Sequence, residues 1–168
     1  TFGVAEGEIL ALIGANGAGK TTLLRTVAGA HPLSGGLISY DGSYLTGVPA
    51  HRRVRRGIAY VPEDRKMQAL VLPMSVRENL TMSIHRALLR FRAFLSRRRE
   101  NEVTDSSVAA LRVKISSREQ RIEDLSGGNQ QKVVIAKGLA TKPRILILDE
   151  PTRGIDVAAK AEVHRIVA

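Results

Sequence analysis

The sequence predicts an α/β fold with a mostly parallel sheet as its core and a helical lobe inserted into that core. Three observations support this prediction. Apolar residues at 9–13 lead into a glycine-rich loop, a second aliphatic run at 145–148 ends in two carboxylates, and the residues between about 74 and 140 follow a helical pattern. Short aliphatic runs that end at turns or acids are typical of buried strands in parallel sheets.

The elements are expected in a definite order along the chain. Apolar runs predict strands near residues 8–13, 37–40, 57–61 and 145–148. A helix near 19–30 follows the glycine-rich loop. Ser75, with Glu78 three residues later, matches a capping box, so another helix is expected to begin there. Further helices are expected from Ser126 to Ala140 and from about Asp156.

The glycine-rich loop carries the residue types of a phosphate-binding loop. Its glycines let backbone N–H groups turn inward around phosphates, and the following helix points the positive end of its dipole at the same place. Lys20 adds a charge for the outer phosphates, and Thr21 offers a hydroxyl to Mg²⁺. The loop therefore predicts a P-loop NTPase fold that binds a nucleoside triphosphate. The residues expected to bind it are Gly14, Ala15, Asn16, Gly17, Ala18, Gly19, Lys20, Thr21 and Thr22.

The second aliphatic run ends in the acidic pair Asp149 and Glu150. A parallel sheet would bring this pair to the phosphate loop, because ligands bind at the carboxyl ends of the strands. Asp149 is then expected to hold Mg²⁺, and Glu150 to polarise the water that attacks the γ-phosphate. Two carboxylates with separate tasks predict hydrolysis. They disfavour the alternative of a module that binds the nucleotide without hydrolysing it.

Composition fits a folded domain with a basic surface. Apolar residues make up 43% of the 168 residues, and the formal net charge is +10. The positive charge gathers at 85–99, which is expected to be a basic helix and could contact nucleic acid or anionic lipid. A solvated helix face is favoured instead, with one side packed against the lobe through Leu88, Leu89, Phe91 and Leu95. The sequence has no cysteine and no apolar stretch long enough to span a membrane.

A further segment, Leu125-Ser126-Gly127-Gly128-Asn129, precedes an expected helix and gives the chain another helix N-terminus that can bind an anion. Together with the phosphate loop and the acidic pair, it resembles the ATP-binding cassette (ABC) family. In that family this signature segment binds the γ-phosphate of ATP held by the phosphate loop of the opposite cassette. The resemblance therefore adds to the expected ATP-binding residues Ser126, Gly127, Gly128 and Asn129.

Two departures from the usual family pattern refine the resemblance. Asn129 stands where the family usually has Gln, and Glu63 stands where most cassettes have a Gln that touches Mg²⁺ and the attacking water. Both are similar to the second cassette of bacterial importers for ribose, xylose, galactose and related sugars. The segment 151–157 also resembles the sugar-type form of the segment that communicates between two cassettes. The resemblance implies the catalytic residues Glu150, Lys20 and Glu63 and the Mg²⁺ ligands Thr21, Glu63 and Asp149.

The resemblance covers nearly the whole chain and implies how the chain is divided. Residues of about 1–73 and 141–168 resemble the catalytic core, and about 74–140 resemble the helical lobe that carries the signature segment. Cassettes normally have an adenine-stacking aromatic residue upstream of the phosphate loop and a γ-phosphate-contacting histidine downstream of the acidic pair. Neither can be assigned in this sequence, so a partial ABC ATPase domain, truncated at both ends, is expected.

The resemblance implies an ATP-hydrolysing subunit that powers import of a sugar-like solute, with ATP and Mg²⁺ as cofactors. Its expected partners are a second ABC cassette, a polytopic membrane permease and, through the permease, a periplasmic or extracellular solute-binding protein. The expected location is the cytoplasmic face of the cell membrane, and no nucleic-acid partner is favoured.

Two alternatives remain open at this stage. Residues 3–57, which include 47–53, also resemble the cassettes of branched-chain amino-acid importers. The intact Lys20-Thr21 counts against the sugar-type second cassette, whose phosphate loop is often degraded. A soluble ABC-type ATPase that acts on ribosomes or nucleic acid is slightly favoured by the basic segment.

Overall fold

The computed structural model describes residues 2–90 and 94–167. Its central strands are β3 (Ile58–Val61) and β6 (Ile145–Leu148), which pair in parallel with Ile58 opposite Ile145 and Val61 opposite Leu148. Two short antiparallel pairs lie outside this sheet. They are β1 (Ser39–Tyr40) with β2 (Ser43–Tyr44), and β4 (Leu89–Arg90) with β5 (Phe94–Leu95).

Helices make up most of the remaining regular structure. They are α1 (Lys20–Ala28), α2 (Ala50–Arg55), α3 (Val76–Thr81), α4 (His85–Leu88), α5 (Arg97–Ala110), α6 (Gly127–Leu139) and α7 (Val157–Val167). Short helical turns are η1 (Arg65–Ala69), η2 (Met82–Ile84) and η3 (Ile122–Asp124). The helices expected after the phosphate loop and after Ser126 are confirmed. The expected capping box is also present, with Ser75 and Glu78 bonded in both directions.

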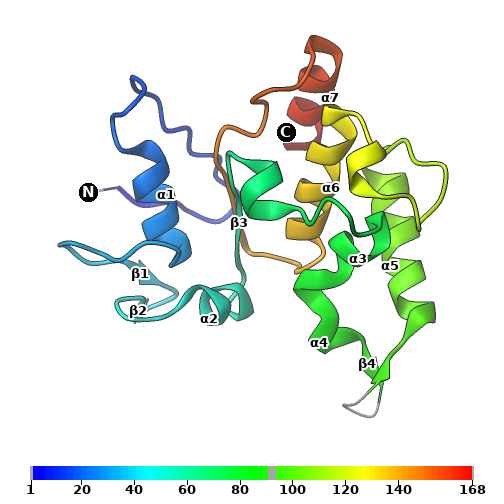
Figure 1. Ribbon diagram of the computed structural model, residues 1–168. Helices are drawn as coiled ribbons and strands as arrows, with labels where there is room; N and C mark the ends of the chain where they lie inside the picture. The colour runs from blue at the N-terminus through cyan, green and yellow to red at the C-terminus, as the bar shows by residue number, and fades with distance from the viewer. Residues whose placement is uncertain (1, 91–93, 168) are drawn as a thin grey trace.

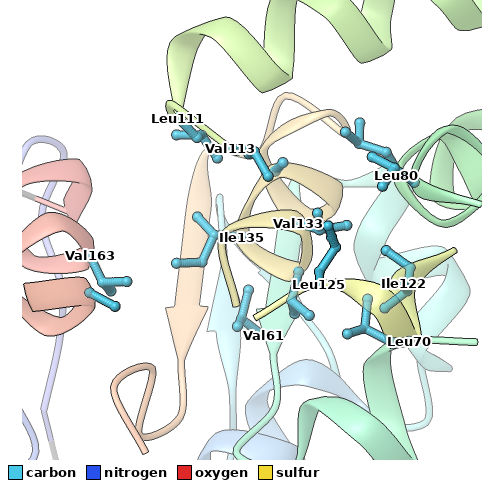
Figure 2. Packing of buried hydrophobic residues seen from close by; sticks show 14 of the residues in the cluster. Val61, Leu70, Leu80, Leu111, Val113, Ile122, Leu125, Val133, Ile135 and Val163 are labelled. Carbon is cyan, nitrogen blue, oxygen red and sulfur yellow. The ribbon is translucent and has the colours of Figure 1, made fainter. Parts of the chain in front are cut away.

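Helix α6 lies in the middle of the molecule, between the α1 side and the α3 and α5 side (Figure 1). All residues from 130 to 136 are buried, so this helix is surrounded over most of its circumference. Figure 2 shows side chains from several elements gathered around it. Those with the least exposure, at 0 to 1%, include Val61, Leu80, Ile122, Val133, Ile135 and Val163. Strand β3 and helices α3, α6 and α7 therefore share one core.

A smaller apolar cluster packs beneath α1 and fixes the helix that follows the phosphate loop. It contains the buried side chains Ala28, Leu45, Ile58 and Ile147. Beside it, the buried guanidinium of Arg53 donates hydrogen bonds to the carbonyl oxygens of Thr26, Val27, Leu45 and Val48, at 2.7 to 2.8 Å. The carbonyls of Thr26 and Val27 belong to the last turn of α1, where carbonyls lack the usual partner within the helix. The end of α1 is thereby tied to the neighbouring loop and to α2.

The strand expected near 8–13 is wrong. None of the described strand pairings includes these residues. Strand β3 pairs with β6, and the other two pairings are the short antiparallel ones of β1 with β2 and of β4 with β5. Without a ladder or a sheet face to cover, the apolar side chains of this segment stay exposed, Ile9 by 74% and Ile13 by 95%. Strand β6 is half-buried over most of its length, and among its four residues only Ile147 is buried.

The single basic helix expected at 85–99 is also wrong. Helix α4 ends at Leu88, an antiparallel strand pair follows, and α5 begins after Ser96. The reason is local, because the Ser96 hydroxyl accepts a hydrogen bond from the N–H of Arg99 and so caps a new helix. Leu88 is buried as expected, but Leu95 is 45% exposed and does not pack as expected. Phe91 lies outside the described residues.

None of the helices that the structure describes is both long enough and apolar enough to cross a membrane.

Candidate functional site

The phosphate loop, Gly14–Thr22, leaves the segment at 9–13 and turns directly into α1. Gly17 and Gly19 have φ values of +82° and +88°, in the left-handed region that glycine adopts most easily. No atom lies within 4 Å of the point where a Cβ would stand at either residue. Because Gly19 has no side chain to cap α1, the first N–H groups of the helix remain available to an anion.

Lys20 folds its side chain back over this loop. Its Nζ donates to the carbonyl oxygens of Gly14 at 2.8 Å and Ala15 at 2.9 Å. A lysine ammonium has three hydrogens, so one is left to point at a phosphate oxygen. Lys20 can therefore hold the loop in shape and bind a ligand in the loop with the same group.

Asp149 is buried at the carboxyl ends of β3 and β6, with an exposed fraction of 2%. The Thr21 hydroxyl donates to its Oδ1 at 3.1 Å, and the Tyr60 hydroxyl donates to its Oδ2 at 2.9 Å. Its backbone N–H continues the ladder by donating to the carbonyl of Val61 at 2.9 Å. The structure thus brings the first turn of α1 and the end of β6 together, as expected for ligands at the carboxyl edge of a parallel sheet.

Tyr60 is a residue of this site that sequence reasoning missed. Burial raises the pKa of its hydroxyl above 10.0, so the hydroxyl stays protonated and can donate at neutral pH. The sequence places Tyr60 within an expected strand. In the structure Tyr60 lies opposite Ile147, two residues before Asp149, and this position could have indicated the contact. That position depends on the register between β3 and β6, which the sequence does not give.

A cleft of about 440 Å³ opens over the phosphate loop, and the side chains of Glu63 and Glu150 line it as well. Glu63, which follows β3, is ion-paired with Arg153. Glu150 is exposed and has a φ of +45°, an uncommon conformation for a glutamate that is often found at functional sites. The lining residues are Asn16, Gly17, Gly19, Lys20, Thr21, Thr22, Glu63, Glu150 and Arg153.

The chemistry of this cleft fits a polyphosphate bound with a divalent cation. Backbone N–H groups and an ammonium offer hydrogen bonds to phosphate oxygens. The Thr21 hydroxyl, which lines the cleft, lies 3.1 Å from the carboxylate of Asp149, which is buried and is not among the lining residues. Both are hard oxygen donors of the kind that Mg²⁺ prefers. Gly14, Ala15 and Ala18 belong to the loop without lining the cleft.

The signature segment, Ser126–Asn129, lies elsewhere, at the start of α6. The Ser126 hydroxyl accepts hydrogen bonds from the backbone N–H of Asn129 at 3.4 Å and from its Nδ2 at 3.0 Å. The Asn129 Oδ1 accepts one from the N–H of Lys114 at 2.9 Å. None of Ser126, Gly127, Gly128 and Asn129 is among the residues that line the described cleft. Their expected role on the nucleotide of a second cassette stays a prediction.

Known proteins resemble this chain over almost its full length. A family model described as ABC transporter matches residues 1–153. The arabinose import ATP-binding protein AraG of Burkholderia pseudomallei (strain 1710b) is 44% identical over 168 residues, which are 99% of this chain and 33% of that relative. A protein of Rhizobium meliloti (strain 1021), whose name describes ribose/galactose/methyl galactoside import ATP binding, is 42% identical over 167 residues, with the same two coverages. The chain spans about a third of the length of these curated relatives.

Solved structures agree on the fold. The dimeric ATP-binding cassette MJ0796, in a post-hydrolysis state bound to ADP and Pi, matches 99% of this chain and 70% of its own chain with a TM-score of 0.80 and 21% sequence identity. This likeness confirms the expected α/β fold of the P-loop NTPase type. Since the family model also matches residues 1–153, the chain belongs to the ABC transporter family.

Proposed function

We propose that this chain binds and hydrolyses ATP and thereby powers the import of a sugar-like solute. The observation that carries this proposal is the cleft in which Lys20, Thr21, Glu63 and Glu150 border one space. Support for the sugar class comes from the two relatives, whose names give arabinose import and ribose/galactose/methyl galactoside import.

Each residue of the cleft has a task that its position allows. The phosphate loop would surround the phosphates with N–H groups, and Lys20 would add its remaining hydrogen bond to an outer phosphate. Glu150, exposed on the cleft wall, would accept a hydrogen bond from the attacking water and orient it. Placing this water in line with the γ-phosphate is most of what a protein contributes to phosphoryl transfer.

Thr21 and Asp149 would hold Mg²⁺, which when bound would neutralise charge on the phosphate oxygens. Tyr60 orients the same carboxylate from the other side. Glu63 would have to leave its ion pair with Arg153 before it could contact the metal or the water. This exchange gives Glu63 two states that differ in partner.

The signature segment supports a paired arrangement of cassettes. Because Ser126–Asn129 lie outside the cleft that Lys20 lines, they are free to serve a nucleotide bound by a second cassette. We propose the corresponding assembly at the cytoplasmic face of the cell membrane, with a polytopic permease and, through it, a solute-binding protein. We also propose that about 1–73 and 141–168 form the catalytic core and that about 74–140 form the helical lobe.

Two arginines of the basic segment at 85–99 already have carboxylate partners, which favours the solvated helix face over a nucleic-acid contact. Arg97 forms an ion pair with Glu119 at 3.3 Å, and Arg98 forms one with Glu102 at 2.8 Å. Arginines that are paired with neighbouring carboxylates have less charge to offer to a phosphate backbone.

The proposal is tested by ATP hydrolysis of the intact protein in liposomes, alone and with the permease and solute-binding protein encoded beside it. The added solutes are arabinose, ribose, galactose and the branched-chain amino acids. Stimulation by a sugar supports the proposal. Stimulation by an amino acid alone would replace the sugar class, and stimulation only by RNA or ribosomes would replace the transport function.

A Glu150→Gln variant tests the hydrolytic step separately. The amide keeps the size of the side chain but is a poor acceptor for the proton of the attacking water, so turnover should fall by about 100-fold or more. Binding of ATP, measured with a fluorescent analogue, should remain close to that of the unchanged protein. Turnover at the original rate would reject the role assigned to Glu150.

A further inference from the structure

Arg65 connects three segments that lie far apart in the sequence. It begins η1, shortly after Glu63. Its Nη1 donates to the carbonyl oxygen of Arg153 at 3.0 Å, and its Nη2 donates to that of Gly154 at 3.2 Å. Its Nε lies 3.5 Å from Oε1 of Gln130, in the first turn of α6. One side chain therefore joins the segment after Glu63, the turn after the acidic pair and the start of the signature helix.

The glycines around Arg65 leave room for its guanidinium. A Cβ at Gly127 would lie 3.0 Å from Arg65 Nη2, and a Cβ at Gly154 would lie 3.6 Å from Nη1. Gly154 also has a φ of +66°, a conformation that glycine adopts without strain. A side chain at Gly127 would therefore crowd the guanidinium, whereas one at Gly154 would strain the backbone of the turn that the guanidinium bonds.

The two carbonyls require an arginine in particular. A guanidinium is planar and holds its N–H donors in a fixed fork, so it can bond two successive carbonyls at once. A lysine ammonium is a single point of charge on a flexible stem. Because the guanidinium donors are charged, these hydrogen bonds are stronger than neutral ones in a similar setting.

The turn that Arg65 holds is directly linked to Glu150. The backbone N–H of Arg153 donates to the carbonyl oxygen of Glu150 at 3.0 Å. The Arg153 side chain forms its ion pair with Glu63 on the other side of the turn. A displacement of this turn would thus move Glu150, which already has an uncommon backbone conformation.

We propose that Arg65 is a positioning residue for hydrolysis, which holds the turn after Glu150 against the start of α6. This inference rests on the proposed function, but Arg65 does not line the phosphate-loop cleft and acts only through the turn.

The test compares Arg65→Ala and Arg65→Lys in the intact protein. Lys66→Ala is the control, since Lys66 is the next residue, has the same charge and is exposed, with no side-chain hydrogen bond or ion pair to any described residue. Amide hydrogen exchange is measured at 151–156 and 126–130, together with kcat and KM for ATP and the melting temperature. Both Arg65 variants should exchange about tenfold faster at 151–156, as the loss of charged hydrogen bonds predicts. Their kcat should fall with KM changed less than about twofold.

These measurements distinguish three effects: the loss of the paired guanidinium hydrogen bonds, the loss of the positive charge, and a general loss of stability. Wild-type behaviour of Arg65→Lys would overturn the inference, because lysine keeps the charge and loses the fork. Unchanged exchange at 151–156 in Arg65→Ala would overturn it as well, as would faster exchange spread evenly over the protein. If the unmodified protein shows no ATP hydrolysis, the proposed function fails, whereas faster exchange confined to 151–156 in the Arg65 variants would still support the role of Arg65 in holding this turn.

Discussion

Helices α1 and α6 both begin at glycine-rich segments, but their first turns are built in different ways. Before α1, Gly17 and Gly19 have positive φ values and face open space, with no atom within 4 Å of an added Cβ. At the start of α6, a Cβ at Gly128 would lie 2.7 Å from the Cβ of Ala159. Ser126 also caps α6 with its side chain, whereas Gly19 cannot cap α1.

The difference teaches that glycine serves two separate purposes in this chain. In the phosphate loop it permits a backbone path that turns N–H groups toward a ligand. At α6 it permits close packing of α7 and of Arg65 against the helix. The first terminus leaves its N–H groups available to an anion within this chain. The second is held in place by its own neighbours, and its Ser126 end stays exposed.

The largest expected effect comes from removing the charge at the start of α1. Lys20→Met loses the ammonium that bonds Gly14 and Ala15 and is left with no donor for a phosphate. ATP affinity, measured by calorimetry, should fall by about 10- to 100-fold, which corresponds to the loss of one or two charged hydrogen bonds. Lys160→Met, at an exposed lysine of α7, should leave the affinity unchanged. Equal affinity in the Lys20 variant would show that the α1 terminus is not the anion site.

Gly128→Ala tests whether the glycine of α6 is there for packing. The added methyl group would meet Ala159 at 2.7 Å, so overpacking should lower the free energy of unfolding by about 1–3 kcal/mol, measured with urea. Gly35→Ala, where the added Cβ meets no atom within 4 Å, should change stability little. A second change, Ala159→Gly, should restore part of the loss. Absence of any rescue would mean that the contact with α7 does not explain the glycine.

Tyr60→Phe tests whether the tyrosine hydroxyl supports Asp149 beside the start of α1. The variant keeps the ring and loses the 2.9 Å hydrogen bond to Asp149, while the bond from Thr21 remains. Support groups around metal ligands commonly affect affinity by 10-fold or more, so the Mn²⁺ affinity in the presence of ADP should fall by about tenfold. Tyr44→Phe is the control, because Tyr44 is 66% exposed. Unaltered Mn²⁺ binding would remove Tyr60 from the site.

The smallest expected effect concerns the ion pair that joins α6 to α7. Lys132, with a side chain 3% exposed, pairs with Glu162 at 2.5 Å, and this contact lowers the pKa of Glu162 below its ordinary 4.5. A lowered pKa in the folded state adds stability above the ordinary value, and this stability is lost as the pH falls through the folded value.

Glu162→Gln should therefore be less stable than the unchanged protein at pH 7 and should lose less stability between about pH 5 and about pH 3. Urea unfolding at these pH values measures the difference. Parallel pH profiles of the two proteins would show that the pair contributes nothing to folding, as is common for pairs that include an exposed carboxylate.

Sequence reasoning succeeded where the signal is local. Gly19 followed by Lys20 places the start of α1, Ser126 places the start of α6, and Ser75 with Glu78 places the start of α3. Each depends on residues within one helical turn, where capping and backbone preference act. The strand expected at 8–13 failed because an apolar run forms a strand only if another strand pairs with it.

The contacts at the site that could not be predicted join residues far apart in the sequence. Tyr60 meets Asp149 only because β3 and β6 pair in one particular register. Arg65 reaches Arg153 and Gly154 only because the chain returns there after the whole helical region. No spacing or composition in the sequence indicates either contact.

By itself, the sequence determined that this protein has a phosphate loop, an acidic pair after a strand, a signature segment and membership of the ABC transporter family, because each is carried by neighbouring residues of fixed type. Only the tertiary structure decided that Thr21 meets Asp149, that Glu63 and Glu150 share one cleft, and that Gly128 is packed beneath α7. The physical reason is that capping and turn geometry act over a few residues, whereas strand register and helix packing are fixed by the combined burial of distant segments.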